Sequence, residues 1–181
     1  MSDIKNNPQP ALIVVTGRPG AGKSTLTHAL ATAIRCPAIC RDAIKEGLVN
    51  TAGQPGGAGD DIQRQAFEAF FETVNLLLTH RITLIAEAAF QHKLWAPKLE
   101  KLAQIAQVRI LVCDIDPRLA RSRRIERGVA DPQRQRFHPD SAVPDEYDPP
   151  HLDLPTLKVD TSDGYRPDFE TLLAFARGRA V

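Results

Sequence analysis

Short apolar runs alternate along this chain with longer stretches in which apolar residues recur at intervals of three and four. The short runs are rich in Val, Ile and Leu, which is typical of strands buried on both faces of a parallel sheet. The longer stretches predict amphipathic helices. We predict strands at residues 11–16, 38–40, 82–86, 108–113 and 157–159. We predict helices at residues 23–34, 60–80, 92–106, 117–127 and 167–177, and one or two helical turns at residues 42–49.

The alternation of strands and helices predicts an α/β fold of three layers, in which helices cover both faces of one five-stranded parallel sheet. The length of 181 residues suits a single domain, which we assign to residues 11–181 after a flexible N-terminus at residues 1–10. Two segments lack an apolar period: residues 51–60 predict a mobile loop, and residues 129–155 predict a loop or lid. Ligands of such sheets bind at the carboxyl ends of the strands, so the candidate site is sought there.

The composition argues against several classes of protein. The net charge of +1 provides no long-range field for nucleic acid or for an acidic membrane. The three cysteines are an odd number without zinc spacing, which favours buried thiols in a reducing compartment. No apolar run approaches the roughly 20 residues of a membrane helix, and the polar N-terminus does not resemble a signal peptide. We therefore expect a cytoplasmic protein with no membrane or nucleic-acid partner.

The segment between the first strand and the following helix reads GRPGAGKS, which fits G-x-x-x-x-G-K-[ST] at every specified position. Its glycines allow the backbone to curl around a phosphate with its N–H groups directed inward, and the next helix adds the positive end of its dipole. The lysine brings charge to the β and γ phosphates, and the serine hydroxyl can bind Mg²⁺. We predict that a nucleoside triphosphate and Mg²⁺ bind here, with nucleotide contacts from Gly17, Gly20, Ala21, Gly22, Lys23, Ser24 and Thr25.

Two carboxylates lie at the predicted ends of strands. Asp42 follows the second strand, where it could accept the proton of a substrate hydroxyl or orient that hydroxyl; the alternative is an N-cap of the next helix. Glu87 ends the third strand as a Walker-B-like acid would, and it could hold a metal or contact substrate. Asp114, which ends the fourth strand, competes for that role, but the loop after Glu87 leads to Phe90 and could shape a substrate pocket.

An arginine cluster follows the fourth strand, and on a helix Arg123 and Arg127 would share a face. Guanidinium groups that close over a triphosphate would neutralise the charge that spreads across its oxygens during transfer. The alternative is a solvated basic face, and the absence of interleaved aromatic residues argues against nucleic acid. The cluster consists of Arg118, Arg121, Arg123, Arg124, Arg127, Arg134 and Arg136.

These motifs together resemble the small P-loop kinases, a broad group related to zeta toxin, chloramphenicol phosphotransferase and polynucleotide kinase. The resemblance covers nearly the whole chain from Ala11 and includes the segments RDAIKE, EAAF and VDTSDGY. It implies a sheet in the order 2-3-1-4-5 and an arginine-bearing lid at about residues 117–140. It also implies that Asp42 is the base or substrate anchor, that Arg123 and Arg127 lie near the triphosphate, and that the loop containing Thr161 lies by the adenine. Glu stands at position 87 where Asp is common in the family.

The leading hypothesis is an ATP-dependent phosphotransferase that acts on a hydroxyl of a small molecule. Its catalytic residues would be Lys23, Asp42, Arg123 and Arg127, with Ser24 and Glu87 as the metal-binding residues. Asp42, Glu87 and Phe90 would contact the acceptor. The alternatives are a nucleotide-dependent switch or ATPase that acts through a protein partner, and a kinase for nucleic-acid ends. The identity of the acceptor and the oligomeric state stay open at this point.

Overall fold

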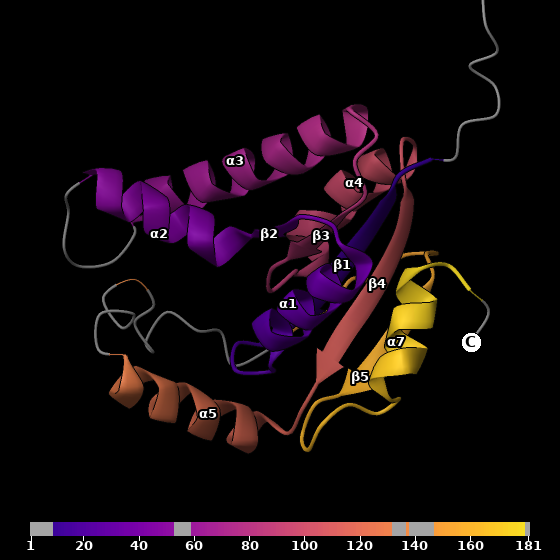
Figure 1. Ribbon diagram of the computed structural model, residues 1–181. Helices are drawn as coiled ribbons and strands as arrows, with labels where there is room; N and C mark the ends of the chain where they lie inside the picture. Colours follow the sequence, from indigo (N-terminus) through magenta and orange to yellow (C-terminus); the bar gives the residue numbers. More distant parts are fainter. Residues whose placement is uncertain (1–8, 53–58, 132–136, 138–146, 180–181) are drawn as a thin grey trace, which may run out of the picture.

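A computed structural model of the chain describes residues 9–52, 59–131, 137 and 147–179. Five parallel strands form one sheet in the order β2-β3-β1-β4-β5, as Figure 1 shows, which confirms the predicted fold class and strand order. In this register Cys40 lies opposite Glu87, and Gly17 lies opposite Cys113, so the carboxyl ends of the central strands meet at one edge. The strands are β1 Ala11–Gly17, β2 Ala38–Cys40, β3 Leu84–Glu87, β4 Gln107–Asp114 and β5 Thr156–Asp160.

Helices occur in every stretch where the apolar period predicted one. The largest difference is α2, which extends over 12 residues instead of one or two turns. Only Lys45 and Val49 of α2 are buried, so the helix lies mostly at the surface beside α3 and carries little apolar period to reveal its length (Figure 1). The helices are α1 Lys23–Ile34, α2 Arg41–Ala52, α3 Asp60–Thr79, α4 His92–Ala103, α5 Pro117–Ala130 and α7 Phe169–Ala176.

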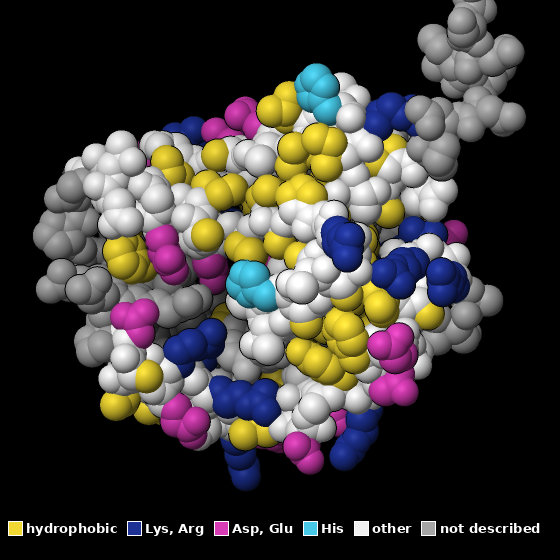
Figure 2. Space-filling model, in the orientation of Figure 1, with side chains coloured by type: hydrophobic (Ala, Val, Ile, Leu, Met, Phe, Trp, Pro, Cys, Tyr) yellow, Lys and Arg dark blue, Asp and Glu magenta, His cyan; other side chains and the backbone are white. Residues whose placement is uncertain are grey.

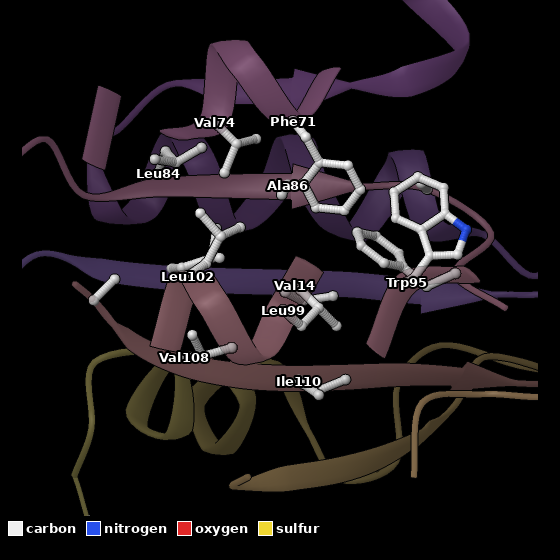
Figure 3. Close-up of a cluster of buried hydrophobic side chains, with 14 of the residues drawn as sticks. Val14, Phe71, Val74, Leu84, Ala86, Trp95, Leu99, Leu102, Val108 and Ile110 are labelled. Atoms are coloured by element: carbon white, nitrogen blue, oxygen red, sulfur yellow. The ribbon is translucent and has the colours of Figure 1, made fainter. Parts of the chain in front are cut away.

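Two apolar clusters lie on opposite faces of the sheet. Along β1, Val14 faces one cluster and Val15 the other, because successive strand side chains point to opposite faces. Helices α3 and α4 cover the first cluster, in which Val74 and Leu99 contact the sheet (Figure 3). Helices α1 and α7 cover the second cluster, to which Leu26 of α1 belongs. Burial on both faces therefore holds β1 rigidly at the centre of the molecule.

Capping residues determine where two of the helices begin. Asp116 accepts hydrogen bonds from the backbone N–H groups of Arg118 (2.8 Å) and Leu119 (3.3 Å), so α5 begins directly after β4. Asp168 caps α7 in the same manner. The predicted loop at residues 51–60 and the predicted lid fall partly outside the described residues, as do Arg134 and Arg136. Within the described part of the chain, no helix combines the length and the apolar character needed to cross a membrane.

Candidate functional site

The loop between β1 and α1 is held close to its neighbours by its glycines. A Cβ added to Gly17 would lie 2.5 Å from the carbonyl oxygen of Cys113, and one on Gly20 would lie 2.2 Å from that of Ala120. Both glycines also have a positive φ, which residues with side chains rarely adopt. Helix α1 follows at once, and its N-cap Gly22 has no side chain to occupy the first N–H groups of the helix. The loop is therefore shaped to present backbone donors to an anion.

Lys23 lies over this loop and faces the carboxylate that ends β3. Its ammonium group is mostly buried, donates a 3.2 Å hydrogen bond to the carbonyl oxygen of Arg18, and lies 4.0 Å from Glu87 Oε1. Glu87 is only 4% exposed, so the two opposite charges balance each other in a setting with little water. A triphosphate entering the loop would give Lys23 a second anionic neighbour.

Ser24 and Glu87, both predicted to bind metal, lie side by side. Ser24 Oγ donates a 3.2 Å hydrogen bond to Glu87 Oε2. Asp114 is instead exposed, and its carboxylate accepts a 3.0 Å hydrogen bond from the backbone N–H of Ile115. The geometry thus favours Glu87 over Asp114 as the Walker-B-like acid.

The oxygens of Ser24 and Glu87 are hard donors of the kind that Mg²⁺ prefers. Among the described residues, no group of three or more His, Cys, Asp and Glu side chains is arranged to hold a metal ion. A magnesium ion at this position would therefore need further ligands from phosphate oxygens and water, which is the usual arrangement in phosphoryl-transfer sites.

Asp42 lies at the start of α2, on the β2 side of the loop. Helix α2 begins at Arg41, so Asp42 is its second residue and not the N-cap that the sequence left as an alternative. Its negative charge acts on Cys40, Arg41 and Lys45, which places all three near the carboxylate. Asp42 makes no hydrogen bond or ion pair with any other described residue. Asp42 therefore has two cations near it but no hydrogen bond to a described residue that would occupy its carboxylate oxygens.

The arginines of α5 are placed differently from one another. Arg123 is half-buried and donates to two backbone carbonyl oxygens, those of Thr161 (2.9 Å) and Ser162 (2.7 Å). This fork joins α5 to the loop that was predicted to lie by the adenine. Arg127 lies one turn further along α5 and is exposed. Over the region of α5, Lys and Arg side chains lie intermixed with Asp and Glu side chains (Figures 1 and 2).

Thr161 contacts the backbone of the phosphate-binding loop through its side chain. Its side chain is buried, and its hydroxyl lies 2.9 Å from the carbonyl oxygen of Ala21 and 3.2 Å from that of Asp114. Arg123, Thr161 and Ala21 thus form a continuous chain of contacts from α5 to the loop. The structure brings together these three predicted nucleotide-binding residues, although Thr161 contacts the loop through its side chain and is closed to solvent.

Phe90 is placed in the core. Its ring has no exposed surface and lies 4.2 Å, centroid to centroid, from Trp95. The backbone N–H of Phe90 donates a 2.9 Å hydrogen bond to Thr16 Oγ1, which fixes the loop after β3 against β1. In this position Phe90 supports the wall of the site, and its buried ring offers no surface to an acceptor.

Two residues that sequence reasoning missed meet beneath the loop. The hydroxyl groups of Thr16 and Tyr147 lie 2.6 Å apart. Burial of the Tyr147 hydroxyl group raises its pKa. This bond ties Tyr147, which lies within the loop or lid predicted at residues 129–155, to the strand that leads into the phosphate-binding loop. No local pattern marks it, because 131 residues separate the partners.

Cys40 also belongs to the site, whereas the sequence suggested only a buried apolar role. It is partly exposed and unpaired, and its pKa is raised to about 12 by burial and then by the nearby charge and hydrogen bonding of Glu87. The charges of Lys23 and Asp42 also act on it. Cys40, at the end of β2, therefore lies near both Lys23 of the phosphate-binding loop and Asp42 at the start of α2.

The glycine loop between β1 and α1, with Lys23 and Ser24 facing the acid at the end of the adjacent strand, defines a P-loop nucleotide-binding protein. A family model described as an AAA domain matches residues 12–147, and the chain belongs to this AAA-domain family. No curated protein sequence matches the chain.

Solved structures show the same fold over nearly the whole chain. A candidate kinase from Chloroflexus aurantiacus is 25% identical with a TM-score of 0.80, and the alignment covers 96% of this chain and 100% of that one. A gluconokinase from Sinorhizobium meliloti 1021 is 21% identical with a TM-score of 0.65, at coverages of 95% and 94%. The APS kinase of Mycobacterium tuberculosis, in complex with AMPPNP and APS, is 17% identical with a TM-score of 0.62, at coverages of 95% and 98%. The fold is that of the small P-loop kinases.

Proposed function

We propose that this protein is an ATP-dependent phosphotransferase that moves the γ-phosphoryl group to a hydroxyl of a small molecule. The observation that carries the proposal is the position of Asp42, a carboxylate without a hydrogen bond or ion pair to another described residue. Asp42, Lys23 and Glu87 all act on Cys40, so the three groups lie near one another. A P-loop that only switched between nucleotide states would not need this second carboxylate near the one at the end of β3. The likeness to kinases with the same fold supports the same class of reaction.

The proposed reaction assigns a separate role to each side of the loop. The acceptor oxygen attacks the γ-phosphorus, the bond from that phosphorus to the β–γ bridging oxygen breaks, and ADP leaves with the released electron pair. The Asp42 carboxylate takes the hydroxyl proton or holds the hydroxyl in line for attack. Lys23 and the N–H groups of Gly20 to Thr25 stabilise the charge on the phosphates. Magnesium held by Ser24 and Glu87 would neutralise charge on the β and γ phosphates.

We place the adenine at the opposite side, where Arg123 and Thr161 hold the loop after β5. Arg127, one turn further along the same helix, would reach the phosphates when the lid segment closes over the nucleotide. Closure would also exclude water, which otherwise competes with the acceptor for the phosphoryl group. The lid, its motion and the role of Arg127 are parts of the proposal.

The direct test is transfer of radioactive phosphate from γ-labelled ATP to a panel of hydroxylated metabolites, antibiotics and nucleosides. We expect labelling of a small molecule, its loss in Lys23→Ala, and no labelling of an oligonucleotide. The control Lys158→Ala changes an exposed lysine on β5 and should retain full activity. Phosphate release without any acceptor, together with ATP-dependent capture of a protein, would instead show a nucleotide-dependent switch.

A further inference from the structure

We propose that the acceptor carries an anionic group, such as a carboxylate or a phosphoryl group, which Arg41 and Lys45 bind beside Asp42. The inference rests on the proposed phosphotransferase function, which it deepens by naming the charge of the second substrate. Two cations on the first turns of α2 have buried groups, and their hydrogen bonds to described residues do not use all of their donors.

Lys45 is a buried lysine with donors to spare. Its side chain belongs to a residue that is only 5% exposed, and its one hydrogen bond to a described residue runs to the backbone carbonyl oxygen of Phe137 at 2.8 Å. An ammonium group has three N–H donors, so two remain for another acceptor. A lysine is rarely enclosed to this degree without an anionic partner.

Arg41 has the same surplus of donors. Its Nη2 donates to Gln63 of α3, at 2.7 Å to the side-chain oxygen and 3.3 Å to the backbone carbonyl oxygen. Its Nε is buried and has no hydrogen-bond partner among the described residues. The contact with Gln63 therefore orients the guanidinium and leaves other N–H groups for a ligand.

The charges of the described residues around these two cations do not compensate their burial. Desolvation lowers the pKa of Lys45 and of Arg41, and it outweighs the opposing attraction of Asp42 in both cases. Glu46 also attracts Lys45, but it acts more weakly than Asp42 and than the repulsion from Arg41. An anion bound between the two side chains would supply the compensation that the nearby carboxylates do not.

Helix geometry places both cations beside the proposed base. Arg41 and Lys45 are four residues apart and share a face of α2, while Asp42 is one residue round the helix from Arg41. The start of the helix adds the positive end of its dipole on the same side. A ligand that binds the two cations therefore brings its neighbouring atoms to Asp42.

The strand order separates these cations from the nucleotide's adenine. β2, which leads into α2, is at one edge of the sheet, and β5, which leads into Thr161, is at the other. The phosphate-binding loop follows β1 in the centre. Arg41 and Lys45 thus lie on the side from which an acceptor would approach, and Lys23 and the loop already serve the triphosphate.

A binding experiment tests the anion site without any turnover. The protein is first saturated with Mg²⁺ and AMPPNP, so that the phosphate-binding loop is filled, and is then titrated with sodium sulfate against sodium chloride of equal ionic strength. Saturable thermal stabilisation by sulfate is expected in the wild type and in Lys45→Arg, which keeps the charge. The double variant Arg41→Gln, Lys45→Gln should bind sulfate roughly tenfold or more weakly.

The matched control neutralises two exposed lysines, Lys101→Gln with Lys158→Gln, and should bind sulfate as the wild type does. Unchanged AMPPNP affinity in every variant shows that each one is folded. Equal sulfate binding in the Arg41, Lys45 double variant and in the wild type would overturn the inference, as would the absence of saturable sulfate binding in the wild type.

Turnover separates this inference from the proposed function. Acceptors are offered as matched neutral and anionic compounds, for example glycerol, glycerate and glycerol 3-phosphate, alongside larger sugars, sugar acids and sugar phosphates. We expect transfer to anionic compounds, with an acceptor KM that rises about tenfold or more in the Arg41, Lys45 double variant while the KM for ATP is unchanged. Transfer to a neutral acceptor with an unchanged KM would overturn the anion site and leave the phosphotransferase. Saturable sulfate binding without transfer to any acceptor would support the anion site and would overturn the proposed phosphotransferase function.

Discussion

The Ser24 hydroxyl donates a hydrogen bond of 3.2 Å to Glu87, although 63 residues separate the two in the chain. Lys23 approaches the other oxygen of the same carboxylate at 4.0 Å. One carboxylate therefore gathers the last two specified residues of the phosphate-binding motif and orients both toward the end of β3. This contact pairs the phosphate-binding motif with one of the two acids, Glu87 and Asp114, that the sequence proposed for this role.

Glu87 should control the reactivity of Cys40. Because the thiol has a pKa of about 12, only about 10⁻⁴ of it is ionised at pH 8, and its alkylation by iodoacetamide should be slow and should accelerate about tenfold per pH unit. Glu87→Gln removes the negative charge that helps to raise this pKa, so alkylation of Cys40 should become severalfold faster. Mass spectrometry of the Cys40 peptide between pH 7 and pH 9 measures both effects.

Cys36 is the internal control for this experiment. Its pKa is raised by burial alone, so the Glu87→Gln change should leave its rate of alkylation unchanged. A Cys40 that reacts at pH 7 as fast as a free thiol, or at the same rate in both proteins, would contradict the expected coupling.

Asp42→Asn should separate chemistry from nucleotide binding. The substitution keeps the shape of the side chain but removes the proton acceptor, so kcat should fall by about 10²–10⁴ while the KM for ATP stays unchanged. Steady-state kinetics with the identified acceptor provide the measurement, and Glu100→Gln on the exposed face of α4 is a control that changes a carboxylate elsewhere. Full activity of the Asn variant would rule out Asp42 as base.

Gly20→Ala and Gly47→Ala should have opposite effects on stability. At Gly20 the new methyl group would meet the carbonyl oxygen of Ala120 at 2.2 Å with φ at +88°, and we expect a loss of about 1–3 kcal/mol together with weaker nucleotide binding. Gly47 lies inside α2 with nothing within 4 Å of a new Cβ, so alanine there should stabilise by roughly 0.5–1 kcal/mol. Urea unfolding measures both, and equal effects would show that the close approach of the loop to α5 is wrong.

Tyr147→Phe should lower stability by about 1 kcal/mol near neutral pH, because it removes the bond to Thr16. The folded protein raises the pKa of Tyr147, so this contribution is present below the ordinary tyrosine pKa of about 10 and is lost as the pH rises above it. The difference in Tm between the wild type and the variant should therefore narrow above pH 10. A difference in Tm that widens as the pH rises above 10 would contradict this prediction.

Most of the fold follows from patterns that are local in the sequence. Buried strands such as β1 and β4 read as continuous apolar runs, and α3 shows a strong three- and four-residue period because one face of it lies on the sheet. Helix α2 was underestimated because it buries few side chains, so its length is decided by contact with α3 instead of by its own period. The strand order came from the resemblance to a family, since no run of apolar residues states which strand it will join.

The sequence by itself determined the phosphate-binding loop, the carboxylates at the strand ends and the class of fold, because glycine conformation, helix and strand periods and motif spacing act over a few residues. Only the tertiary structure decided which of these groups meet. In the structure Glu87, and not Asp114, is the neighbour of Ser24. Arg123 donates to the backbone of the loop after β5, and Phe90 is buried in the core. The tertiary structure also encloses Lys45 beside Asp42, because close contacts between residues far apart in the chain depend on how the whole sheet and its helices pack together.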